Sequence, residues 1–208
     1  VDERFRPRPT AVSEDMERQE QLDIRTPYIL FLGTIQPRKN LIRLIAAFDR
    51  LAESYPDLRL ILAGGAGWLS NPITEAVDRS PNRARIVMPG HVPDDLLPEL
   101  YAGASAAVFP SLYEGFGLPA AEAMASGTPV VVSNRGALPE VVGEAGVLVD
   151  PLDIDSIAAG IRAALEPSTR GRRIEAGIEQ AARFRWDTAA SETIEVIHEA
   201  INSAGIDR

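Results

Sequence analysis

Two glutamates in one glycine-rich stretch carry the clearest chemical signal in the sequence. Seven residues separate Glu114 from Glu122, and Gly115 and Gly117 lie between them. The proline after Leu118 suits the first turn of a helix, because its missing N–H group costs nothing there. The backbone N–H groups of Gly117 and Leu118 would then be free at a helix amino terminus and could bind an anion. This arrangement predicts a site in which two carboxylates accept hydrogen bonds from polyols on either side of a phosphate.

Two other interpretations apply to the same stretch. Glu122 could be a capping-box acid of the helix, with Glu114 a solvated loop charge. The residues from Gly115 to Ala120 also fit the dinucleotide fingerprint G-x-G-x-x-A. That fingerprint directly follows a strand that opens its domain, whereas here five residues intervene after a later strand. No acidic residue ends the next strand to bind a ribose, so we disfavour a dinucleotide-dependent oxidoreductase.

Short apolar runs alternate with amphipathic stretches, and this alternation places the glutamates in a fold. Buried strands are predicted for residues 28–32, 58–63, 84–88, 106–109, 129–133 and 146–149. Helices are predicted for 41–51, 71–79, 94–102, 119–126, 153–165, 170–184 and 188–201. Asn40 is expected to cap the first of these helices. The pattern predicts an α/β fold, a doubly wound Rossmann-like parallel sheet of about six strands with helices on both faces.

Ligands of such a sheet bind outside the carboxyl ends of its strands. The loops at those ends are rich in Gly, Pro and polar residues, and they span 33–40, 64–69, 89–94, 110–119 and 134–139. Residues 1–26 lack a clear periodicity and are interpreted as an inter-domain linker with a lead-in helix over 12–24. The domain proper is therefore assigned to residues 27–208.

Composition excludes several functional classes. The chain has 208 residues, 45% of them hydrophobic, which is enough for one domain with a full core. It contains no cysteine, so thiolate nucleophiles, zinc–cysteine sites and iron–sulfur clusters are excluded. A net charge of −9 argues against a nucleic-acid partner. The apolar runs fall far short of the ~20 residues that span a membrane, and no signal peptide is recognised, so we expect a cytoplasmic domain.

The stretch from Glu114 to Glu122 resembles the E-x7-E signature of retaining glycosyltransferases of the GT-B fold, family four. The similarity continues through residues 123–131 and 138–140, and it includes residues 28–39. Residues 1–7 are similar to the linker between the two Rossmann-like halves of these enzymes. The resemblance spans nearly the whole chain and implies the carboxy-terminal, donor-binding half without the amino-terminal, acceptor-binding half.

The resemblance also implies a role for each residue of the motif. Glu122 would bind the ribose hydroxyls of a sugar nucleotide, and Glu114 would contact hydroxyls of the donor sugar. Lys39 would bind the diphosphate, where a cation stabilises the charge of the departing nucleoside diphosphate. Further donor-binding residues implied in this way are Gly33, Thr34, Gly115, Phe116, Gly117 and Leu118, with the amides of Gly117 and Leu118 on the diphosphate.

One position departs from the family. Many members have an arginine directly after the glycine that closes the first strand, but this chain has Thr34 there. Arg38 is the candidate for that second cationic role. His91 and Val92 lie where the base-contacting loop of the family would be. No acidic metal-binding triplet is visible, so neither a metal nor another cofactor is expected.

Three other residues have simpler interpretations than ligand contact. Trp68 follows a glycine-rich loop and is interpreted as an anchor of that loop. Trp186 is interpreted as a core residue, and His198 as a structural residue among the isoleucines at helical spacing around it.

The resemblance implies transfer of a hexosyl group from a nucleoside-diphosphate sugar to an acceptor hydroxyl. The Pro-Arg-Lys-Asn sequence at 37–40 resembles the phosphate loop of family members that use GDP-mannose-like donors, and this resemblance implies such a donor here. A stand-alone nucleotide-sugar-binding module without catalysis stays the alternative. The expected partners are the nucleotide sugar and the amino-terminal half, through which any peripheral membrane association would occur. The present chain alone is expected to be catalytically inactive.

Overall fold

A computed structural model describes residues 1–7 and 22–203, in which the chain folds around a six-stranded parallel sheet. Most of its strands are buried on both faces, as a parallel sheet covered by helices requires. The strands are β1 (Tyr28–Leu32), β2 (Arg59–Ala63), β3 (Ile86–Gly90), β4 (Ala106–Phe109), β5 (Val130–Ser133) and β6 (Val147–Val149). The predicted doubly wound α/β fold is confirmed.

The sheet has the order β3-β2-β1-β4-β5-β6. β1 pairs with β2 on one side, with Leu30 opposite Ile61, and with β4 on the other, with Leu30 opposite Ala107. The chain therefore moves outward in one direction from β1 to β3 and in the other direction from β4 to β6. Such a reversal of strand order leaves a crevice between the loops that follow β1 and β4.

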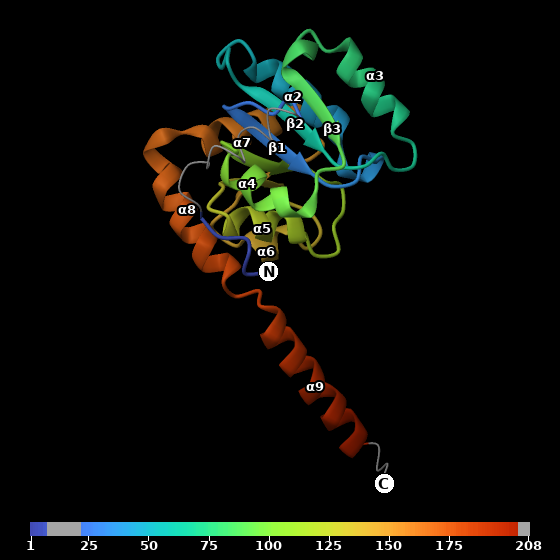
Figure 1. The fold of residues 1–208 in the computed structure, drawn as a ribbon, viewed down its shortest axis with the longest axis vertical. Coiled ribbons are helices and arrows are strands. Elements are labelled where there is room, and N and C mark those ends of the chain that lie inside the picture. Colours follow the sequence, from blue (N-terminus) through green and yellow to red (C-terminus); the bar gives the residue numbers. More distant parts are fainter. Residues whose placement is uncertain (8–21, 204–208) are drawn as a thin grey trace.

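Helices cover both faces of the sheet (Figure 1). The α-helices are α2 (Leu41–Leu51), α3 (Asn71–Arg79), α4 (Leu97–Ala102), α5 (Leu118–Ala125), α6 (Leu138–Val142), α7 (Ile154–Leu165), α8 (Pro167–Ala181) and α9 (Trp186–Ser203). Short 3-10 turns occur at η1 (Pro37–Lys39), η2 (Arg83–Arg85) and η3 (Asp94–Leu96). Helix α2 packs against α3 and α7, whereas α5 packs against α4, α6 and α8. The two groups form the outer layers of the domain.

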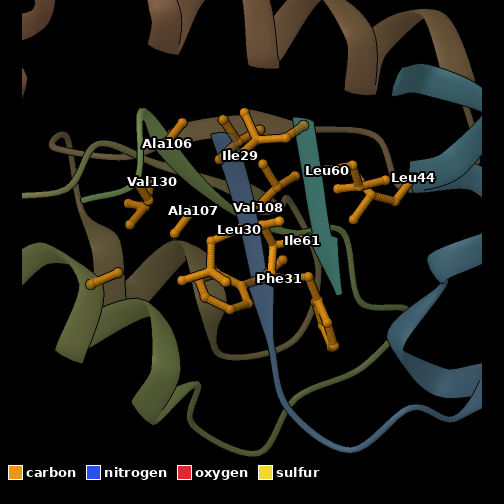
Figure 2. Packing of buried hydrophobic residues seen from close by; sticks show 14 of the residues in the cluster. Ile29, Leu30, Phe31, Leu44, Leu60, Ile61, Ala106, Ala107, Val108 and Val130 are labelled. Atoms are coloured by element: carbon orange, nitrogen blue, oxygen red, sulfur yellow. The ribbon is translucent and has the colours of Figure 1, made fainter. Parts of the chain in front are cut away.

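The core lies where these layers meet the central strands. Figure 2 shows side chains of β1, β2, β4 and β5 packed together, with Leu44 of α2 reaching them from one side. Ile29, Leu30 and Phe31 are fully buried there. The central strands are thus fixed by packing on both faces, which gives the loops at their carboxyl ends a rigid base.

Four elements differ clearly from the sequence-based expectation. Helix α8 (Pro167–Ala181) begins and ends three residues earlier than the predicted 170–184. The third strand begins at Ile86, because Arg83–Arg85 form a 3-10 turn. In that turn Arg85 donates to the carbonyls of Tyr55 and Pro56 at 2.9 and 2.8 Å, which holds the segment out of the sheet. The helix predicted for 94–102 is divided into η3 and α4, with a proline in the first turn of α4. Helix α6 was expected as loop, since five residues give too short a pattern to detect.

Helix α9 contradicts two predictions. None of its residues is buried, and it extends away from the sheet layers (Figure 1). Trp186, predicted to be core, has 63% of its surface exposed. His198 is also exposed, so the isoleucines around it form no packed structural site within the described residues. Helical spacing was correct, but the apolar face of α9 does not contact this sheet.

The lead-in 1–26 contributes to the core at two points. Phe5 and Ile24 are both buried in the same cluster as the strands. The lead-in helix predicted for 12–24 lies mostly outside the described residues. The assignment of this segment as a linker therefore stays a prediction, although part of it packs on the domain.

Candidate functional site

Three loops meet at the reversal of strand order. They follow β1, β4 and β5, and main-chain hydrogen bonds join them. The N–H of Leu112 donates to the carbonyl of Arg38 at 2.9 Å, and the N–H of Ala137 donates to the carbonyl of Glu114 at 3.3 Å. The loop with the first glutamate is therefore held between its two neighbours.

A cluster of charged side chains lies between the first two loops. The Lys39 ammonium contacts Glu114 Oε1 at 2.6 Å, and Arg38 Nη1 contacts Glu114 Oε2 at 2.7 Å. The hydroxyl of Ser111 donates to the same Oε1 at 2.7 Å. Arg38 also donates to the carbonyl of Tyr113. The structure thus brings Arg38, Lys39 and Glu114 together, as the sequence-based hypothesis requires.

The Glu114 carboxylate is ionised more readily than an ordinary glutamate. Burial favours its neutral form, but hydrogen bonds from Lys39, Ser111 and Arg38 outweigh that effect and lower its pKa. Only 11% of the Lys39 side chain and 12% of the Glu114 side chain is exposed, compared with 37% for Arg38. Lys39 and Glu114 therefore form a largely buried ion pair, and Arg38 covers it on the solvent side.

Asn40 holds the first two loops in this register. It has a left-handed backbone with φ of 60°, and its side-chain amide donates to the carbonyls of Pro110 and Pro151 at 2.9 and 2.6 Å. The expectation that Asn40 caps α2 through its side chain is wrong, since that side chain makes no capping bond. Its amide is used to fasten the loop after β4, and its Oδ1 accepts from Arg43.

Helix α5 starts at Leu118, directly after the glycine-rich loop. Gly117 precedes it with φ of 106°, a conformation that favours glycine. A Cβ on Gly117 would lie 2.6 Å from Leu138 Cδ2, so the close packing of α6 also requires glycine here. Gly115 has open space where a Cβ would stand. Pro119 has no N–H group, and the N–H groups of Ala120 and Ala121 both donate to the carbonyl of Gly117, at 2.9 and 3.3 Å. The N–H of Leu118 is therefore the donor that the first turn of α5 leaves at the predicted anion site.

Glu122 lies further along α5 and is half-buried. Its Oε2 accepts a hydrogen bond from the Tyr101 hydroxyl at 3.1 Å. No side chain caps α5, so the capping-box interpretation of Glu122 is wrong. Burial raises the pKa of this carboxyl above its ordinary value, although the Tyr101 hydrogen bond and the charge of Arg4 oppose the shift.

The other predicted residues are spread around this centre. Gly33 lies beside Lys39: a Cβ built on Gly33 would be 3.9 Å from the ammonium nitrogen of Lys39. Phe116 is 40% exposed and meets the ring of Phe184 edge-on, with 5.3 Å between centroids. His91 is exposed, whereas the Val92 side chain is only 3% exposed and packs in the core. A contact between Val92 and a donor would therefore use its main chain, and the donor-binding role of Val92 stays a prediction.

Thr34 and Trp68 lie on the loops that follow β1 and β2. Thr34 lies close to Gly67, where a Cβ would come within 2.7 Å of Thr34 Cγ2. A side chain larger than threonine would crowd this approach of the two loops. Trp68 is mostly exposed and donates from Nε1 to the side-chain oxygen of Gln36 at 2.8 Å, as a loop anchor would.

Two residues that contact the glutamates, Ser111 and Tyr101, were not predicted from the sequence. Ser111 is fully buried against Glu114, and its only signal is a small polar residue just after a buried strand. Tyr101 follows the apolar pattern of its helix, so nothing in the sequence distinguishes its hydroxyl from that of an ordinary core tyrosine. Both are polar groups whose partners come from other elements.

Residues 1–7 and 22–203 contain no group of three or more His, Cys, Asp or Glu side chains placed to hold a metal ion. Nor does any helix among them have the length and apolar character needed to span a bilayer.

Known proteins similar to this chain share its motifs and fold. The family model for glycosyl transferases group 1 matches residues 12–180, which include Lys39, Glu114 and Glu122. O-antigen chain mannosyltransferase B of Escherichia coli is 44% identical over 169 residues, 80% of this chain and 44% of that enzyme. Glycogen synthase of Mycobacterium tuberculosis is 37% identical over 81% of this chain and 41% of that enzyme. The chain thus spans about half the length of these relatives.

Solved structures show the same fold. Sucrose-phosphate synthase of Thermosynechococcus elongatus superimposes with a TM-score of 0.82 and 27% identity, over 98% of this chain and 51% of the synthase. The carboxy-terminal domain of a glycosyl transferase group 1 family protein of Francisella tularensis gives 0.73 and 25%, over 88% of this chain and 97% of that domain. The chain belongs to the glycosyl transferases group 1 family and corresponds to its carboxy-terminal domain.

Proposed function

We propose that this chain is the donor-binding half of a retaining glycosyltransferase that moves a hexosyl group from a nucleoside-diphosphate sugar to an acceptor hydroxyl. The single observation that carries the proposal is the convergence of Lys39 and Arg38 on Glu114, beside the start of α5. Two cations and a helix amino terminus at one point suit a diphosphate. The carboxylates of Glu114 and Glu122 then suit the hydroxyl-bearing groups on either side of it.

Each end of the donor has its own partner in this scheme. The diphosphate contacts Lys39, Arg38 and the amides of Gly117 and Leu118, and the ribose hydroxyls donate to Glu122. The Lys39 ammonium that now contacts Glu114 turns to the diphosphate when donor binds. This exchange frees a Glu114 oxygen to accept hydrogen bonds from the donor sugar.

The bond changes follow from this placement. The bond between the anomeric carbon and the diphosphate oxygen breaks, and its electron pair leaves with the phosphate. Lys39 and Arg38 stabilise that charge as it develops, which is the largest kind of contribution a fixed site makes. The acceptor oxygen bonds to the anomeric carbon and gives its proton to the departing phosphate. In this scheme Glu114 positions the sugar and is not the nucleophile, because the Oε1 that Lys39 leaves accepts from the sugar hydroxyls while the Ser111 hydroxyl still donates to it.

The names of relatives guide the choice of donor. O-antigen chain mannosyltransferase B of Escherichia coli and an α-(1→4)-mannosyltransferase of Mycolicibacterium hassiacum, 47% identical over 113 residues, both point to a mannosyl group. GDP-mannose is therefore the first donor to test. We also propose an amino-terminal half as the partner that holds the acceptor, a cytoplasmic location, and membrane contact only through that half.

A binding experiment with the 208-residue chain tests the proposal. GDP, UDP, ADP and their hexose conjugates are added in a thermal-shift screen, and the best binder is measured by calorimetry with and without EDTA. A ligand that binds the native state raises its stability by about 2.7 kcal/mol at 100 times Kd. The expected result is metal-independent binding of one nucleotide sugar. Loss of binding in EDTA would remove the metal-free scheme, and no binding of any nucleotide would remove the proposal.

A further inference from the structure

Tyr101 is a buried residue that directly contacts one of the two glutamates. It lies on α4, is fully buried, and donates its hydroxyl hydrogen bond to Glu122 Oε2 on α5 at 3.1 Å. The ring of Phe5 packs edge-on against its ring, with 5.8 Å between centroids. The Thr128 hydroxyl donates to its backbone carbonyl at 2.6 Å. Both its ring and its main chain are thus held in place.

Tyr28 shows what an ordinary buried tyrosine does in this fold. It is also fully buried, and its hydroxyl donates to the backbone carbonyl of Leu100 at 2.6 Å. A buried tyrosine hydroxyl needs a partner, and a neutral carbonyl satisfies that need. Tyr101 instead uses a carboxylate that is half-exposed and belongs to the candidate site. Its bond therefore fixes a side chain that is free to meet a ligand.

We propose that Tyr101 is the positioning residue for Glu122 and makes the site select a ribose with free 2′- and 3′-hydroxyls. The bond to Oε2 sets the rotation of the carboxylate and leaves Oε1 and the remaining lone pair of Oε2 to accept from the ribose. This inference rests on the proposed role of Glu122 as the ribose ligand.

The electrostatics of Glu122 give Tyr101 a second effect. Burial raises the pKa of Glu122, whereas the Tyr101 hydrogen bond and the charges of Arg4 and the Val1 amino group lower it and Asp2 raises it. Without the hydroxyl, burial would dominate further and the carboxyl would hold its proton to a higher pH. A protonated carboxyl is a poorer acceptor for a ribose hydroxyl.

The test compares Tyr101→Phe with Tyr28→Phe in the full 208-residue chain. Each variant keeps a buried ring and loses one hydroxyl, so Tyr28→Phe is a matched control for stability. Calorimetry measures GDP, UDP and their 2′,3′-dideoxy counterparts against both variants and the unaltered chain. The ribose preference is the ratio of the two Kd values for the better-binding base.

We expect the unaltered chain to prefer the ribonucleotide by about tenfold or more, as the loss of bonds to a charged acceptor implies. Tyr101→Phe reduces this preference about three- to tenfold, and Tyr28→Phe leaves it unchanged. Ribonucleotide binding by Tyr101→Phe also weakens at a higher pH on acidification than binding by the unaltered chain.

Two results separate the inference from its basis. If Tyr101→Phe keeps the full ribose preference and the same pH profile, the inference is overturned while the role of Glu122 survives. If the unaltered chain binds ribo- and dideoxynucleotides equally, the ribose role of Glu122 is wrong and the inference falls with it. Should Tyr101→Phe not fold, Phe5→Leu, which loosens the packing on Tyr101 but keeps its hydroxyl, is expected to reduce the preference more weakly. An unchanged preference in that variant would then overturn the inference.

Discussion

The two glutamates of one short motif have opposite electrostatic environments. Glu114 contacts two cations and a hydroxyl, and its pKa is lowered although burial opposes the shift. The carboxylate of Glu122 accepts one hydrogen bond, from the Tyr101 hydroxyl. Burial is the largest influence on its pKa, which is raised. Both belong to the same stretch: Glu114 lies in the loop that precedes α5, and Glu122 lies in α5 itself. Sequence spacing alone does not set the chemistry of a carboxylate, because neighbours from other elements decide it.

The difference indicates a division of labour. The Glu114 carboxylate already contacts two cations, and a bound diphosphate would replace it as their partner. Glu114 therefore marks the charged centre of the site. Among residues 1–7 and 22–203, no cation forms an ion pair with Glu122, and its carboxylate has lone pairs left over. Such a carboxylate suits neutral hydroxyl donors, so Glu122 suits a ribose. Predictions that alter one end and leave the other intact measure this division.

The largest effect is expected at the cationic end. Lys39→Ala in an enzyme that includes an upstream half should lower kcat about 10²- to 10³-fold, because it removes stabilisation of the departing diphosphate. Steady-state transfer assays at saturating donor measure this. The control is Arg50→Ala, which removes an exposed cation paired with Asp155 on the outer layer. This variant should leave kcat nearly unchanged. An unchanged kcat for Lys39→Ala would mean that the cluster is merely structural.

The next effect concerns the ribose end. Glu122→Ala should weaken GDP and GDP-mannose alike, by about tenfold or more. Glu114→Ala should weaken GDP-mannose relative to GDP, since only the sugar depends on it in the proposed scheme. Calorimetry with both ligands gives the two ratios, and Glu179→Ala on the exposed side of α8 is the control. Equal losses for both ligands in both variants would remove the division between the two glutamates.

A smaller effect with the opposite sign is expected for a bare diphosphate. Glu114 competes for Lys39 and Arg38, so Glu114→Gln should bind inorganic pyrophosphate about two- to tenfold more tightly than the unaltered chain. Glu122→Gln should not change pyrophosphate binding, because that ligand has no hydroxyls to donate. Weaker pyrophosphate binding by Glu114→Gln would show that the carboxylate organises the cations and does not compete with the anion.

Most of the fold could be predicted from the sequence, since strands buried on both faces are short apolar runs with clear ends. Helix α3 matched its predicted range, as did the strands β1 and β4. The misplaced elements depend on distant contacts. Arg85 bonds to carbonyls of the segment before β2, and no local pattern reveals such a bond. Similarly, the apolar stripe of α9 indicates a helix but not which surface it contacts.

The site was predictable to a different degree. Arg38 and Lys39 do meet Glu114, because the carboxyl ends of β1 and β4 are neighbours in the sheet. The polar groups that hold them could not be predicted. Asparagine is a residue type that often caps helices, but the side chain of Asn40 holds two loops together. Tyr101 has the helical spacing of a core residue, but its hydroxyl contacts Glu122. For each residue the sequence is compatible with two different environments, and only the tertiary packing decides between them.

The smallest effect is the pH dependence of stability, where the two glutamates should differ in sign. The folded-state pKa of Glu114 lies below its ordinary 4.5, so its contribution to stability is present above that pH and is lost as the pH falls through the lowered pKa. The folded-state pKa of Glu122 lies above 4.5, so the native form is favoured by the proton and loses stability as the pH rises through the raised pKa. Glu114→Gln should therefore flatten the loss of unfolding free energy on acidification, whereas Glu122→Gln should steepen it. Urea midpoints measured between about pH 3.5 and 7, with the ionic strength held constant, give both slopes against the unaltered chain. The lower limit lies about one unit below the ordinary glutamate pKa and the upper limit about 2.5 units above it. Slopes that shift in the same direction for both variants would show that the two carboxylates share one environment, and the division between a charged centre and a hydroxyl-binding end would then have no electrostatic basis.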